Sequence, residues 1–182
     1  MSHFSHLIKA WPARIVRVED IDFGRPWGYF DGSSQATGCG GGGCLFMETT
    51  HSFQFAAGLG GGTNNYAELM ALKLLLLLAV EKGCRSLQVF GDSLLVIGWA
   101  QAMIRCSIVR LLPILEEVHR LKLLFDRISF KHVYKERNTL ADSLSKEAAL
   151  RPYGQWFIIE HGAEGVYRYF HRPFHEPQQH LF

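Results

Sequence analysis

Residues 60–92 read GGGTNNYAELMALKLLLLLAVEKGCRSLQVFGD, and this stretch indicates the architecture of the whole chain. Its leucine-rich centre consists of good helix formers as far as about Lys82. Gly83 then suits the left-handed conformation that commonly ends a helix. The following residues 86–91 are mainly apolar and are short enough for one strand. The stretch therefore predicts a helix followed by a strand, with Asp92 where the strand ends.

Four carboxylates lie at the boundaries of predicted elements. Glu68 falls in the first turn of the helix, and Asp92 follows the strand. Asp31 ends an earlier strand in the sequence GYFDGS, and Asp142 falls in the first turn of a later helix, NTLADSLSKEAAL. Neighbouring strands would bring these carboxylates together as ligands for a hard divalent ion such as Mg²⁺. The alternatives are an ordinary Asp-Gly turn at Asp31, or four unrelated surface acids among the 17 acidic residues.

The order of the elements predicts an α/β fold. A strand–helix–strand unit favours parallel pairing through a right-handed crossover, whereas three consecutive opening strands favour an antiparallel meander. We therefore expect a mixed five-stranded sheet, three antiparallel strands followed by parallel strands, with helices on both faces. The predicted segments are strands at 27–30, 44–49, 52–59, 86–91 and 128–134, and helices at 66–82, 93–101, 114–125 and 138–150, the first of them preceded by Thr63, Asn64 and Asn65 with an asparagine as its N-cap.

The glycine tract GCGGGG, residues 38–43, contains a literal G-x-G-x-x-G. A dinucleotide-binding fingerprint needs a helix directly after it, and a phosphate loop ends in Lys followed by Ser or Thr. Here two predicted strands follow, and no Lys-Ser or Lys-Thr ends the tract. We interpret the glycines as part of a strand that another backbone or a ligand approaches closely.

The composition is typical of a globular protein, with 48% hydrophobic residues, 20% charged residues and a formal net charge of +2. A chain of 182 residues most simply forms one domain. The four cysteines contain no C-x-x-C pair and the N-terminus shows no secretory signal, so we expect reduced thiols in an intracellular protein that is not secreted. The apolar run 74–78 is too short for a membrane span of about 20 residues, so we expect no membrane partner.

Composition divides the chain into three parts. Residues 1–22 form a lead-in with little periodicity, and residues 23–150 form the main domain. Residues 151–182 are rich in aromatic side chains and histidine, and their segments 155–160 and 166–170 predict a hairpin appended to the domain. The histidines of this extension lack compact ligand spacing, so we expect them at the surface or in an interface. A docking arm for another protein chain is the alternative role of the extension.

Four motifs, FDGS, TNNYAEL, FGDS and HVYKERNTLADSLSKEA, resemble those of ribonuclease H type 1 in order and approximate spacing. The resemblance covers roughly residues 23–150 and is closest to ribonuclease H-like domains related to plant reverse transcriptases and retroelements. It implies that Asp31, Glu68, Asp92 and Asp142 are the catalytic and metal-binding carboxylates. Two Mg²⁺ ions, or Mn²⁺ in their place, would then lie about 4 Å apart and serve both ends of an in-line displacement. The implied substrate is the RNA strand of an RNA–DNA hybrid, cut by water to leave 3′-hydroxyl and 5′-phosphate ends.

The same resemblance implies a set of substrate contacts. An asparagine pair at a helix start can offer side-chain amides to 2′-hydroxyls while backbone amides face phosphate, which distinguishes RNA from DNA. Simple helix capping is the alternative, and the two roles are compatible. The implied contact residues are Gly32, Ser33, Thr63, Asn64, Asn65, Lys135 and Arg137.

Three departures from the bacterial type 1 enzymes affect the expected rate. Residues 111–127 form an ordinary amphipathic helix in place of a basic handle for the hybrid, and Leu94 stands where those enzymes often carry glutamine. Their mobile histidine has no obvious counterpart, because we expect His132 to point from its strand. The loop offers Lys135 and Arg137 instead, which can stabilise charge but are poorer proton shuttles than imidazole. We therefore expect slow cleavage.

The leading hypothesis is a Mg²⁺-dependent endoribonuclease acting on RNA–DNA hybrids. The main alternative is a catalytically weak or inactive domesticated domain that binds nucleic acid or docks a protein. A polymerase, in the same polyprotein or separate, is a candidate partner for the C-terminal extension. A third hypothesis is an interaction module without nucleic acid, which would show no salt-dependent binding to the hybrid.

Overall fold

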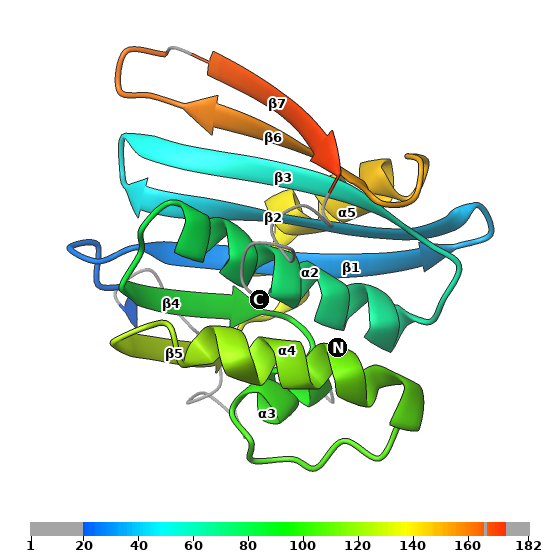
Figure 1. The fold of residues 1–182 in the computed structure, drawn as a ribbon. Coiled ribbons are helices and arrows are strands. Elements are labelled where there is room, and N and C mark those ends of the chain that lie inside the picture. The colour runs from blue at the N-terminus through cyan, green and yellow to red at the C-terminus, as the bar shows by residue number, and fades with distance from the viewer. Residues whose placement is uncertain (1–19, 166, 174–182) are drawn as a thin grey trace, which may run out of the picture.

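The computed structural model describes residues 20–165 and 167–173, which form one mixed sheet with helices on both faces (Figure 1). The sheet has seven strands in the order β5-β4-β1-β2-β3-β6-β7. β1, β2 and β3 form an antiparallel meander, and β4 and β5 continue parallel to β1. The strands are β1 (Trp27–Gln35), β2 (Gly38–Glu48), β3 (His51–Gly60), β4 (Ser86–Gly91), β5 (Arg127–His132), β6 (Gln155–His161) and β7 (Tyr167–Pro173).

The predicted arrangement of five strands is confirmed, and the C-terminal hairpin extends it. β6 pairs antiparallel with β3 and β7 pairs antiparallel with β6, so the hairpin is continuous with the main sheet. One strand boundary was wrong in the sequence analysis, because β1 runs on to Gln35 and Asp31 lies within it. The reason is that the glycine tract belongs to β2, whose Gly42 pairs with Asp31.

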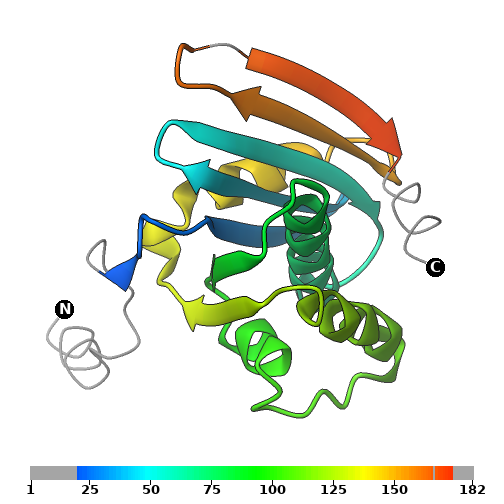
Figure 2. The same ribbon diagram turned by 60° about the vertical axis from the view of Figure 1, so that its left-hand side comes forward.

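The helices form two layers. α2 and α4 cover one face of the sheet, and α5 covers the other (Figures 1 and 2). Thr63 caps α2, since its hydroxyl accepts a hydrogen bond from Tyr66 N at 3.2 Å; the asparagines that follow are already helical. Gly83 has φ +79°, as expected for the residue that ends this helix. The helices are α2 (Asn64–Glu81), α3 (Leu94–Ala100), α4 (Leu112–Lys122) and α5 (Thr139–Ala148), with 3-10 turns η3 (Val109–Leu111) and η4 (Lys135–Arg137).

The core is built on α2, which is buried from Ala67 to Ala79 without interruption. The sheet covers one side of this helix and α4 covers another, which explains its all-apolar centre. Lys73 is only 4% exposed and is ion-paired with Glu117 of α4, so its charge is compensated inside the layer. All four cysteines are buried free thiols. Within the described residues, no helix has both the length and the apolar content that a membrane span needs.

The glycine tract of β2 allows α5 to lie directly on the sheet. A Cβ atom on Gly40 would lie 2.1 Å from the carbonyl oxygen of Ser145, and a Cβ atom on Gly42 would lie 2.5 Å from the amide nitrogen of Ser145. Both distances are shorter than real contacts of a Cβ atom, so these positions exclude side chains. The prediction that another backbone approaches the tract is confirmed, and that backbone belongs to α5.

Candidate active site

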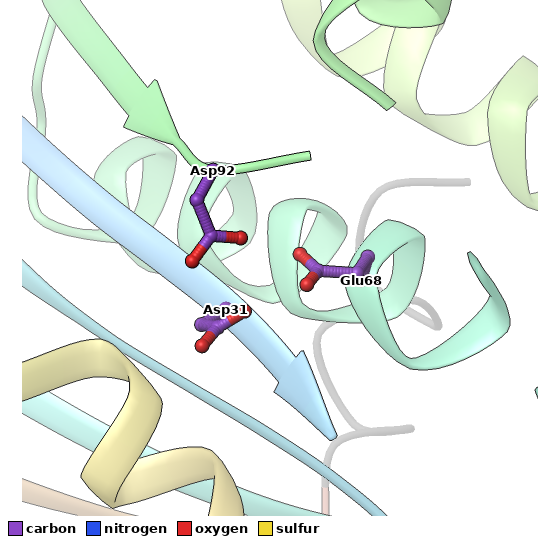
Figure 3. A group of neighbouring side chains, drawn as sticks. All are labelled: Asp31, Glu68 and Asp92. Atoms are coloured by element: carbon purple, nitrogen blue, oxygen red, sulfur yellow. The ribbon is translucent and has the colours of Figure 1, made fainter. Parts of the chain in front are cut away.

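Three of the four predicted carboxylates meet at one point beside the end of β4. One oxygen from each of Asp31, Glu68 and Asp92 lies within 4.8 Å of the others, and the three side chains point toward one another (Figure 3). The parallel register explains the meeting of the two aspartates. Phe30 of β1 is opposite Gly91, the last residue of β4, so Asp31 and Asp92 follow side by side.

Gly32 brings the third carboxylate into the cluster. A Cβ atom at this position would lie 2.3 Å from Ala67 C and from Glu68 N, so only glycine lets the first turn of α2 approach β1 this closely. Its own amide donates a hydrogen bond of 2.9 Å to Asp31 Oδ1. Ser33, the next residue, donates its hydroxyl to Ser145 O at 3.0 Å and ties β1 to α5. Contact of Gly32 and Ser33 with an RNA strand stays a prediction.

The cluster concentrates negative charge in a poorly solvated place. Asp31 is 3% exposed, and burial together with the adjacent Asp92 raises its pKa to about 6. Burial and the neighbouring Asp31 raise the pKa of Glu68 as well. Burial also raises the pKa of Asp92, an effect opposed by the amide of Asn138. Like charges this close disfavour one another's ionisation, which a bound cation would reverse.

The donor set fits a hard divalent cation. All the converging ligand atoms are carboxylate oxygens, which Mg²⁺ and Mn²⁺ prefer over nitrogen or sulfur. Glu68 Oε2 is buried and has no hydrogen-bond partner within the described residues. An unpaired buried carboxylate oxygen is costly, and a cation bound at this atom would remove that cost.

Asp142 lies at the margin of the cluster. It lies in the first turn of α5 and interacts with Asp31, but its oxygens are not among the three that converge within 4.8 Å. Lys146, one turn further along the helix, contacts Asp142 Oδ2 at 3.0 Å. Partial burial raises the pKa of Asp142, but the hydrogen bonds from Lys146 and Asp31 outweigh it and leave this pKa below its ordinary value.

The predicted substrate contacts lie on β1, at the start of α2 and on η4. Thr63 and Asn64 are exposed at the start of α2, and Asn65 is half-buried there. Lys135 and Arg137 are exposed on η4. The positive charge of Lys135 favours the ionised forms of Asp92 and Asp142.

Sequence reasoning missed the roles of two side chains, Asn138 and His132. Asn138 occupies the N-cap position of α5 but makes no capping bond; its Nδ2 donates to Phe30 O at 2.9 Å and to Asp92 Oδ2 at 3.4 Å. His132 was expected only to point from its strand; its Nε2 lies 3.1 Å from Asp92 O, a contact that was not predicted. The pairing of β5 with β4 accounts for this, because it sets His132 opposite Gly91. Knowledge of that register would have placed the histidine beside the cluster.

A cavity of about 230 Å³ adjoins Asn138 on the α5 side of the sheet. Its walls are aromatic and aliphatic except for Arg137 and the start of α5. The lining residues are Tyr29, Cys44, Phe46, Arg137, Asn138, Thr139, Leu140 and Ala141.

Comparison with known proteins identifies the family to which this chain belongs. Residues 29–148 match the family described as reverse transcriptase-like. No curated protein matches the chain. Ribonuclease H1 from the archaeon Halobacterium salinarum NRC-1 is similar in structure, with a TM-score of 0.62 and 28% identity, over 68% of this chain and 96% of that chain.

Two further solved structures share the fold. The N-terminal ribonuclease H domain of a Mycobacterium tuberculosis protein, fused to maltose-binding protein, gives a TM-score of 0.60 and 27% identity, over 69% of this chain and 98% of that one. LC11 ribonuclease H1, isolated from compost by a metagenomic approach and crystallised in complex with an RNA/DNA hybrid, gives a TM-score of 0.59 and 23% identity, over 69% and 96% of the two chains. At that identity the likeness shows the fold alone.

Proposed function

Because the chain belongs to the reverse transcriptase-like family and has a ribonuclease H-like fold, we propose that it is a metal-dependent endoribonuclease acting on RNA–DNA hybrids. The observation that carries the proposal is the convergence of Asp31, Glu68 and Asp92. The archaeal and mycobacterial structures reported above, at 28% and 27% identity, are both ribonuclease H domains, which supports the same reaction class.

The residues have distinct parts in this proposal. Asp31, Glu68 and Asp92 would hold Mg²⁺ or Mn²⁺, and Asp142 would join a second ion after release from Lys146. Two such ions, when bound, activate water at neutral pH and stabilise the leaving oxygen of a phosphodiester. Lys135 offers a positive charge toward the scissile phosphate.

Recognition of the RNA strand is assigned to the start of α2. Thr63, Asn64 and Asn65 present side-chain and backbone polar groups beside Glu68, where 2′-hydroxyls of an RNA strand can be read. Gly32 and Ser33 follow Asp31 on β1, and Arg137 adds an exposed cation on η4. The proposed substrate is therefore a hybrid whose RNA strand passes over the carboxylates.

The test is cleavage of an end-labelled RNA–DNA hybrid in Mg²⁺ and in Mn²⁺, beside single-stranded RNA and duplex DNA. Asp92→Asn keeps the shape of a cluster ligand and removes its charge, so it should abolish cleavage with little loss of fold. Asp126→Asn is the matched control, because Asp126 is exposed, pairs with Arg85 and precedes β5, at the opposite end of the parallel strands. Near-normal cleavage by Asp92→Asn would refute the assignment.

A second candidate function is hybrid binding without turnover. The ion pair between Asp142 and Lys146 favours it, since a cation already occupies the fourth carboxylate. Leu94, which is exposed directly after the cluster, also removes one polar contact from this edge. Salt-dependent affinity for the hybrid, with no product in either metal from folded protein, would support this candidate over the nuclease.

A further inference from the structure

Asn138 connects the three elements that carry the aspartates. Its side chain is 2% exposed and donates to the carbonyl of Phe30, which directly precedes Asp31, and to the carboxylate of Asp92. Its own carbonyl accepts the amide of Asp142 at 3.0 Å, in the first turn of α5. Asn138 thus contacts the backbone carbonyl that precedes Asp31, the carboxylate of Asp92 and the amide of Asp142.

We propose that Asn138 is a positioning residue for the metal-holding carboxylates, orienting Asp92 against β1 without contacting substrate or metal itself. The proposal rests on the proposed function in that the site is taken to hold a divalent cation.

A neutral amide suits this task better than a charged donor. An asparagine NH₂ group donates two hydrogen bonds, here one to a backbone carbonyl and one to a carboxylate. A lysine or arginine at the same place would orient Asp92 equally well but would compete with the cation for its charge. The amide therefore fixes the direction of the carboxylate and leaves its negative charge for the metal, as groups that support metal ligands do elsewhere.

The competing explanation is that Asn138 only satisfies a buried carbonyl. Its N-cap position makes this explanation weak, because the locally available capping bonds of α5 are not made. The side chain instead reaches across to β1 and β4, and its Oδ1 has no hydrogen-bond partner within the described residues. Local capping therefore does not account for the place of this side chain, whose buried acceptor stays unpaired while its amide contacts a carboxylate.

The experiment measures Mg²⁺ and Mn²⁺ affinity by isothermal titration calorimetry of the full chain, with hybrid cleavage measured in parallel. Asn138→Ala should weaken metal binding by about tenfold or more and lower kcat with little change in KM for the hybrid. Gln88→Ala is the matched control. Gln88 is a buried amide of β4, the strand that Asp92 follows; its Oε1 accepts a hydrogen bond from Asp22 N and its Nε2 donates one to Asp22 O, both at 2.9 Å.

The control should lose stability in urea denaturation while keeping the metal affinity of the parent protein. If Asn138→Ala does not fold, Asn138→Ser keeps a donor that is too short to reach both partners, and it should show the same loss of affinity. Unchanged metal affinity in a folded Asn138 variant would overturn the proposal.

Calorimetry separates this proposal from the proposed function. If the affinity of the parent protein for Mg²⁺ or Mn²⁺ depends on Asn138 but no hybrid is cut, the positioning role is retained and the nuclease is lost. If the parent protein cuts the hybrid and its metal affinity does not depend on Asn138, the nuclease is retained and the positioning role is lost. A parent that binds neither ion overturns both.

Discussion

The carboxylates of the cluster lie where their negative charges are poorly solvated and close to one another. Asp31 and Glu68 are buried next to each other, and such an arrangement costs stability unless protons or cations reduce the repulsion. At the scale of single residues, repulsion among the ionised carboxylates therefore lowers the free energy of unfolding. Protonation and metal occupancy of the site should both be visible in the stability of the protein.

The stability of the metal-free protein should increase as pH falls from about 7 to about 5. The folded-state pKa of Asp31 is raised to about 6, against about 3.9 for an unfolded aspartate, so the folded state binds more protons in this window. The stabilising contribution is complete below the unfolded value and is lost as pH rises through the folded value. Thermal unfolding in EDTA measures it, and Asp31→Asn should flatten the dependence relative to the parent. Parallel Tm curves for the two proteins would contradict the assignment.

Mg²⁺ should stabilise the folded protein, and more strongly at pH 8 than at pH 5.5. A ligand that binds only the folded state at a hundred times its Kd adds about 2.7 kcal/mol to the free energy of unfolding. Protons compete for the same oxygens at the lower pH, so the gain shrinks there. Thermal scans with and without the ion measure the effect. Asp92→Asn should lose it, whereas Asp126→Asn should keep it; an equal gain in both variants would show that the ion binds elsewhere.

Three of the carboxylates named from the sequence, Asp31, Glu68 and Asp92, converge in the structure, whereas the contacts of Asn138 were not predicted. Glu68 and Asp92 stand beside strong local signals, a capped helix start and a strand end. For Asn138 the local pattern predicts a helix cap, and nothing nearby in the chain reveals that its partner is Phe30, 108 positions away. Residues that act through tertiary contacts have no local signature.

Among the elements, α5 and β2 show how close backbone packing sets the site. Gly40 and Gly42 let the helix lie on the strand, and the same helix presents Asp142 at its first turn. The sequence predicted a close approach at the glycine tract but not its partner, because a tract without side chains carries no information about what covers it. The extent of β1 was missed for the same reason, since its second half pairs with that tract.

Gly42→Ala should destabilise the protein and displace α5. Its Cβ atom would meet the backbone of Ser145, which cannot move aside as a flexible side chain can, so we expect a loss of about 1–3 kcal/mol. Urea denaturation measures the loss. Gly61→Ala is the matched control, because a Cβ atom there meets nothing within 4 Å and the substitution should be nearly neutral. Equal stability of the two variants would show that the α5 contact can relax.

On the scale of the whole molecule, the C-terminal hairpin is a structural part of the sheet. β6 pairs with β3 from Ser52 to Ala57, and Trp156 of β6 is fully buried against Phe55. The aromatic composition of this segment predicted a hairpin, but the long-range pairing that joins it to β3 has no signal in the hairpin's own sequence. Docking of another chain by the extension stays a prediction.

Trp156→Ala should therefore cost about 3–5 kcal/mol of stability, as large-to-small substitutions in cores do. Tyr169→Ala is the comparison, since Tyr169 belongs to the same hairpin but is mostly exposed, and its loss should be small. Chemical denaturation of both variants measures the difference. A small loss at Trp156 would show that the hairpin is an independent appendage.

The two helical layers supply the site from opposite faces of the sheet, Glu68 from α2 and Asp142 from α5. The order of synthesis gives this arrangement a consequence. Asp31, Glu68 and Asp92 leave the ribosome well before Asn138 and Asp142, so a nascent chain lacks both the support of Asp92 and the fourth acid until α5 emerges and docks. Under the proposed function, hydrolysis would therefore begin only after α5 has docked and the fold is complete.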